Sequence, residues 1–178
     1  MGPDGQDTFQ LRYYVCDDAH RHATEDQPAG PIFFYLGNEA NVRPADTVSI
    51  AYTGNSHGSV NTVPQPSCSL FRKIPVQVLL YVNATGLMWE NAKEFGAMLI
   101  FAEHRYYGES LPFGADTFKH MQWLTTEQAL ADYASLIYDL KSKRSLEDVP
   151  VIGFGGSYGG MLGAWGRLKY PHVRHFTR

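Results

Sequence analysis

One serine lies at the centre of the strongest chemical motif in the sequence, GGSYG at positions 155–159. The pattern Gly-x-Ser-x-Gly is typical of a nucleophile elbow, a sharp turn between a strand and a helix that exposes the serine hydroxyl. Here the motif follows an apolar run, 149–154, and precedes a helical run, 160–170. The sequence therefore predicts Ser157 as a nucleophile, with the backbone N–H of Tyr158 as an oxyanion donor. The alternative is a glycine-rich phosphate cradle, which the absence of a Lys-Ser/Thr pair disfavours.

A second candidate group follows the apolar run 31–36, where the residues GNEA occupy positions 37–40. In an α/β-hydrolase the loop after such a strand supplies the second oxyanion N–H. We expect Asn38 to provide that group and Glu39 to support the loop. From composition alone, an ordinary turn at the end of a strand is equally compatible with these residues.

A third group, EHRYYG at positions 103–108, follows the apolar run at 97–102. Its charged side chains should gather at the same edge of the sheet as the elbow. We expect Glu103, Arg105 and Tyr106 to support loops or substrate, and a buried ion-pair network is favoured over direct chemistry. His104 is interpreted as structural, because in the hydrolase order the base follows the serine.

These groups need a sheet that brings strand ends together. Short apolar runs predict buried strands, and an alternating segment, 9–15, predicts a half-exposed edge strand. Thr125 and Gln128 have capping-box spacing and predict the start of a helix, while a second helix should end at Gly96. Alternating strands and helices predict an α/β class with a mostly parallel sheet. The expected strands are 9–15, 31–36, 97–102 and 149–154.

Length and composition narrow the alternatives. The 178 residues suit one domain, 1–178, although the proline-rich stretch 41–80 is expected to be a loop insertion. A net charge of −3 without a basic run disfavours a nucleic-acid partner. The sequence contains no run of about 18 apolar residues, so no membrane-spanning helix is expected. The first residues contain no signal-peptide core. Two cysteines, Cys16 and Cys68, are expected to be unpaired thiols.

Five blocks, taken in order, resemble the lysosomal Pro-X carboxypeptidase and dipeptidyl peptidase II family of serine peptidases; they lie at 30–39, 101–114, 124–132, 155–162 and 169–173. The resemblance implies an α/β-hydrolase fold, Ser157 as nucleophile, and peptide substrates with proline near the cleaved bond. It implies no metal and no cofactor, places the protein in lysosomes or outside the cell, and is compatible with a homodimer. A glycosylation sequon begins at Asn83, and it matters only on the secretory route.

The sequence also departs from that family. Ala40 replaces a family glycine, and 41–80 replaces what the family spans in a few residues. The family continues into another strand, a cap domain and the catalytic Asp and His, so the fold here is expected to be truncated after the nucleophile helix. The residues from Tyr158 to Arg178 include no Asp or Glu, and His172 and His175 should lie roughly 20 Å from the serine.

We therefore expect the 178-residue chain alone to hydrolyse proline peptides negligibly. Two other functions stay open at this point: an esterase or lipase on the same fold, and a non-catalytic variant product. The residues present do not choose between a carboxypeptidase and a dipeptidyl peptidase.

Overall fold

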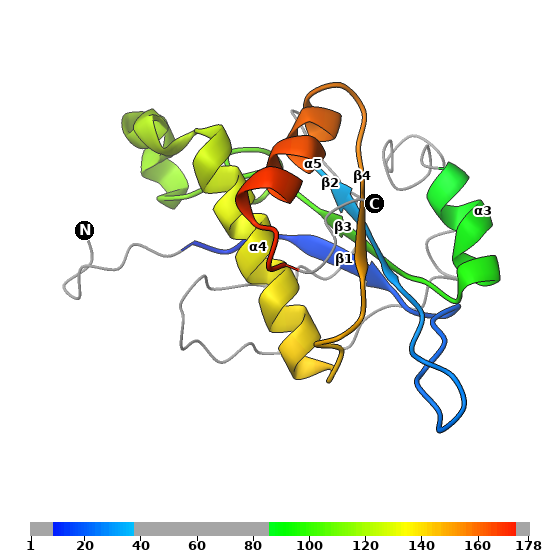
Figure 1. Cartoon of the computed structure of the whole chain (residues 1–178). Coiled ribbons are helices and arrows are strands. Elements are labelled where there is room, and N and C mark those ends of the chain that lie inside the picture. Colours follow the sequence, from blue (N-terminus) through cyan, green and yellow to red (C-terminus); the bar gives the residue numbers. More distant parts are fainter. Residues whose placement is uncertain (1–8, 38–85, 174–178) are drawn as a thin grey trace, which may run out of the picture.

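A four-stranded sheet forms the centre of the structure, a computed structural model that describes residues 9–37 and 86–173 (Figure 1). The strand order is β1-β3-β2-β4. The strands are β1 (Tyr13–Cys16), β2 (Ile32–Leu36), β3 (Met98–Ala102) and β4 (Val151–Phe154), and the helices are α3 (Gly86–Phe95), the 3₁₀ segment η1 (Gly114–Trp123), α4 (Thr126–Lys143) and α5 (Ser157–Lys169).

Parallel pairing of β2 with both β3 and β4 brings three strand ends to one edge of the sheet. Phe34 of β2 lies opposite Ile100 of β3 and Gly153 of β4. This arrangement confirms the predicted parallel neighbours, while β1 pairs with β3 in the antiparallel sense. The loops after β2, β3 and β4 therefore leave the sheet on the same side.

The helices cover both faces of the sheet, with α4 and α5 on one side and α3 on the other (Figure 1). Leu130, Tyr133 and Ile137 of α4 and Leu162 of α5 pack in one buried cluster with alternate strand residues. Met88 of α3 packs in a second cluster with the remaining strand residues. The mixed α/β class and mostly parallel sheet expected from the sequence are confirmed.

Two local predictions about helix ends are confirmed. The side chain of Thr125 accepts a hydrogen bond from the backbone N–H of Gln128 at 3.3 Å, so Thr125 caps the start of α4. Gly96 follows α3 with φ of +60°, a conformation in which a side chain would be strained.

The edge strands differ from expectation in their burial. All of β1 is buried, because Tyr13 and Val15 face the α4 side while Tyr14 and Cys16 face the α3 side. The alternation that suggested exposure includes Arg12, which is buried in an ion pair rather than solvated. Only Val151 of β4 is buried, because within the described ranges β4 pairs with β2 alone.

The expectation of unpaired thiols is wrong for Cys16, which is disulfide-bonded. Cys68 is the only other cysteine in the sequence and lies outside the described residues. A count of two cysteines excludes a multi-disulfide scaffold but says nothing about whether the two meet in space.

The expected insertion at 41–80 also lies outside the described residues. Within residues 9–37 and 86–173, no helix combines the length and apolar character that a membrane crossing requires.

Candidate active site

Ser157 is the first residue of α5, and Gly155 and Gly156 join it to the end of β4. Its φ is +52°, in the left-handed region that L-residues other than asparagine and aspartate rarely adopt. The residue is exposed to solvent. A strained, exposed serine between a parallel strand and a helix has the geometry of a nucleophile elbow.

Close backbone approach explains one of the glycines in this turn. A Cβ added at Gly155 would lie 2.5 Å from the carbonyl carbon of Gly159 and 2.9 Å from the nitrogen of Gly160. The prediction that glycine at 155 keeps a Cβ out of a crowded turn is confirmed. At Gly156 a Cβ would meet nothing within 4 Å, so crowding does not require glycine there.

The phenol of Tyr158 ties the first turn of α5 to two other elements. Its hydroxyl lies 3.2 Å from Nε2 of His104, in the loop after β3, and 3.2 Å from Oγ1 of Thr126, in the first turn of α4. The backbone N–H of Tyr158 belongs to the first helical turn, whose N–H groups have no partner within the helix. The proposed role of that N–H as oxyanion donor stays a prediction.

His104 is engaged at both ring nitrogens. Nδ1 lies 2.8 Å from the carbonyl oxygen of Arg105, and Nε2 faces the hydroxyl of Tyr158. The side chain is only 2% exposed. These contacts favour the structural interpretation of His104 over a role as base.

Glu103 is fully buried at the end of β3 and accepts several hydrogen bonds. Its carboxylate forms an ion pair with Arg12, accepts from Oγ of Ser110 at 2.8 Å, and accepts from the backbone N–H of Glu109 at 3.1 Å. The expected ion-pair network is therefore present, and it fixes the 103–110 loop against β1.

Arg105 forms a second, partly buried ion pair, with Asp132 of α4. Its Nε and Nη2 donate to the two carboxylate oxygens, each at 2.7 Å, and its Nη1 donates to the carbonyl of Trp123 at 3.0 Å. The guanidinium also lies 5.2 Å from the ring centroid of Phe9. Burial raises the pKa of Asp132, and the guanidinium opposes this shift. Arg105 thus joins three elements, which are the loop that follows β3, the helix α4 and the end of η1.

Tyr106 extends the same loop in a left-handed conformation, with φ of +68°. Its hydroxyl donates to the carbonyl of His120 in η1, and burial raises the pKa of Tyr106. Tyr106 and Arg105 therefore both hold η1, which supports the expected loop-positioning role.

The sequence analysis did not identify Tyr133 of α4 as part of the site. Its hydroxyl donates to the carbonyl of Gly37 at 2.8 Å, immediately after β2, and burial raises the pKa of Tyr133 well above its ordinary value. A Cβ at Gly37 would lie 2.2 Å from the carbonyl oxygen of Ala102. Tyrosine at a core position of a helix is the signal that could have revealed this contact, because a buried hydroxyl needs a partner.

Three predicted site residues, Asn38, Glu39 and Asn83, lie outside the described residues. His172 lies three residues beyond Lys169, the last residue of α5, and is exposed. It is therefore at the opposite end of that helix from Ser157.

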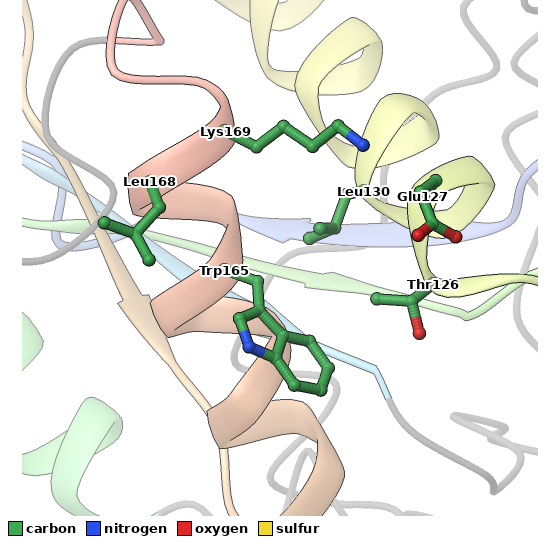
Figure 2. Close-up of a pocket in the computed structure, with 6 residues that line it drawn as sticks. All are labelled: Thr126, Glu127, Leu130, Trp165, Leu168 and Lys169. Carbon is green, nitrogen blue, oxygen red and sulfur yellow. The ribbon is translucent and has the colours of Figure 1, made fainter.

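A pocket of about 420 Å³ lies between α4 and α5 (Figure 2). Ser157 is not among its lining residues, which are Thr126, Glu127, Leu130, Trp165, Leu168 and Lys169. Its wall combines three apolar side chains with one acidic and one basic group. The pocket therefore lies beside α5 rather than at Ser157.

Comparison with known proteins gives a consistent picture for this chain. Residues 80–175 match the family described as "Serine carboxypeptidase S28". The chain is similar to lysosomal Pro-X carboxypeptidases, with 43% identity over 170 residues for those of Pongo abelii and Mus musculus and 42% over 170 residues for that of Homo sapiens. Each match covers 93% of this chain but 26% of the relative, so the chain spans about a quarter of the length of these relatives.

Proposed function

Because this chain belongs to the serine carboxypeptidase S28 family, we propose that it carries the nucleophile of a serine exopeptidase that cleaves next to proline. Ser157 attacks the peptide carbonyl and forms an acyl-enzyme, which water then hydrolyses. The backbone N–H groups of Tyr158 and Asn38 stabilise the oxyanion. The fold to which these residues belong is an α/β-hydrolase, of which the described elements form the part up to the nucleophile helix.

One observation carries this proposal: Ser157 combines left-handed backbone geometry with exposure at the end of β4. Ser145 has similar backbone geometry and is also exposed, but only Ser157 combines these features with a place between the end of β4 and the start of α5. Gly155 supports the same reading, since its lack of a side chain lets the turn close tightly. Peptidase chemistry rather than esterase chemistry is supported by the family match over residues 80–175.

Preference for proline is proposed from the names of the relatives, which are Pro-X carboxypeptidases. Their names also support a lysosomal location, and a secreted form would have the same chemistry. The disulfide at Cys16 supports a lysosomal or secreted location over a cytosolic one, because disulfides persist in oxidising compartments and are rare in the cytosol. Glycosylation at Asn83 and a homodimer of the complete protein are parts of the same proposal.

The 178-residue chain by itself is proposed to be inactive. A hydrolase triad of this type needs an acid and a histidine after the serine, and the stretch from Tyr158 to Arg178 contains no Asp or Glu. His172 lies beyond the far end of α5, roughly 20 Å from Ser157 at 1.5 Å of rise per residue. Without its triad partners, a serine hydrolase keeps only a residual advantage of about 10³ to 10⁴ over water.

The test compares two proteins that share this segment. The first is the purified 178-residue chain, with which turnover of proline peptides should not exceed that of its Ser157→Ala variant. The second is a Pro-X carboxypeptidase whose matching segment is replaced by residues 80–175 of this chain. This chimera should cleave proline peptides, and Ser157→Ala should abolish cleavage. A folded chimera that is inactive, or one that is unaffected by Ser157→Ala, would contradict the proposal.

A further inference from the structure

We propose that His104 and Thr126 are positioning residues that hold the first turn of α5 in place through the hydroxyl of Tyr158. The first turn carries both Ser157 and the N–H of Tyr158. The catalytic importance of this turn rests on the proposed function, in which Ser157 is the nucleophile. The contacts themselves do not depend on what Ser157 does.

The hydrogen bonds form a chain with one consistent direction. The carbonyl of Arg105 can only accept, so Nδ1 of His104 carries the proton that is donated across 2.8 Å. In the neutral ring Nε2 then accepts, and its donor is the hydroxyl of Tyr158 at 3.2 Å. The oxygen of Tyr158 in turn accepts from the hydroxyl of Thr126 at 3.2 Å. The three hydrogen bonds are therefore mutually compatible.

Both partners of the phenol belong to elements other than α5, and one of them is buried. The His104 ring lies 5.5 Å from the ring of Tyr107 and 6.4 Å from that of Tyr133, and its side chain is buried. Thr126 is the first residue of α4, directly after the helix cap. Opening of the first turn of α5 would therefore break two hydrogen bonds to fixed partners.

The backbone strain at Ser157 explains why contacts that hold this turn are needed. A non-glycine residue in the left-handed region is strained, and this conformation persists only when its surroundings enforce it. The next residue along the chain is Tyr158, and its side chain supplies contacts outside the helix. His104 and Thr126 act on the elbow through Tyr158 and contact no reacting atom in this role.

Hydrogen exchange in the 178-residue chain tests the effect on the turn. The N–H of Gly160 bonds to the carbonyl of Gly156 in the first turn, and the N–H of Tyr170 bonds to that of Gly166 at the other end of α5. In Tyr158→Phe the Gly160 amide should exchange about tenfold faster, since the hydrogen bonds of the phenol with His104 and Thr126 are both lost. The Tyr170 amide should change less than twofold. Equal effects at both ends would overturn the proposal.

Matched variants separate this effect from general destabilisation. Tyr138→Phe removes a hydroxyl from an exposed tyrosine of α4 and should leave Gly160 exchange unchanged. Thr126→Val should accelerate Gly160 exchange, and Thr126→Ser should restore it, because serine keeps the hydroxyl. Thr126→Val also provides the test if Tyr158→Phe does not fold. Failure of Thr126→Ser to restore the wild-type rate would count against the proposal.

Nitrogen-15 NMR of the His104 ring supplies a signature that simple packing would not produce. Near neutral pH, Nδ1 should be protonated and Nε2 unprotonated, and Tyr158→Phe should shift the Nε2 resonance while Ser157→Ala should not. A ring protonated only at Nε2 would overturn the proposed direction of the chain. None of these readouts uses the Ser157 hydroxyl, so an inactive chimera would contradict the proposed function and leave this inference standing.

Discussion

Substitution of two adjacent glycines should separate a crowded position in the elbow from an open one. In Gly155→Ala the new methyl group would lie 2.5 Å from the carbonyl carbon and 2.6 Å from the carbonyl oxygen of Gly159. These are backbone atoms at the start of α5, so no flexible side chain can move aside. Overpacking of this kind typically costs about 1–3 kcal/mol. Because backbone must shift, we expect about 3 kcal/mol for Gly155→Ala.

Gly156→Ala is the matched control. Its Cβ would meet nothing within 4 Å, and its φ of −113° suits any residue. A small loss of capping preference and a small gain from reduced unfolded-state entropy should leave stability within about 0.5 kcal/mol of wild type.

Thermal unfolding followed by circular dichroism measures both variants. For a chain of this size, 3 kcal/mol corresponds to a fall in Tm of about 6–12 °C for Gly155→Ala, against about 2 °C or less for Gly156→Ala. Equal losses in the two variants would refute the close approach of the strand end to the start of α5. The elbow geometry assigned to Ser157 would then lose its structural support.

Three other predictions concern the elements around the site. Arg105→Lys keeps the charge but loses the two-pronged contact with Asp132 and the hydrogen bond from Nη1 to the carbonyl of Trp123 at the end of η1, so η1 should be cleaved faster in limited proteolysis; an unchanged cleavage rate would contradict a role of Arg105 in holding η1. Tyr133→Phe leaves the buried carbonyl of Gly37 without its donor and should lower the free energy of unfolding in urea by about 1–3 kcal/mol; a loss under 0.5 kcal/mol would argue against this contact. Burial lowers the pKa of His20, so the unfolded chain binds its proton more readily and stability should fall as the pH drops from the ordinary histidine pKa through the lowered one. In His20→Gln, urea unfolding should show a smaller loss over that pH range, and an unchanged loss would exclude this group as its source.

Several features were predictable because they depend on residues that are close in sequence. The Thr125 cap, the end of α3 at Gly96 and the elbow at 155–159 each lie within one turn or one strand-turn-helix unit. Parallel pairing of the core strands also followed from their apolar character and from the helices between them.

Other features depended on partners that sequence spacing does not specify. The pairing of Arg12 with Glu103 joins residues 91 positions apart, and it buries a charge that the alternating pattern placed in solvent. Cys16 was similarly misjudged, because whether a thiol meets a partner depends on where the chain returns in space.

The sequence by itself determined where the proposed nucleophile, Ser157, lies and what its turn looks like, because glycines and an apolar strand impose that geometry locally. Tertiary structure decided what holds the turn. Tyr158 contacts His104 and Thr126 only because the parallel sheet brings the loop after β3 and the start of α4 to the edge where β4 ends. Whether these side chains come within hydrogen-bonding distance depends on tertiary packing, for which a one-dimensional pattern contains no signal.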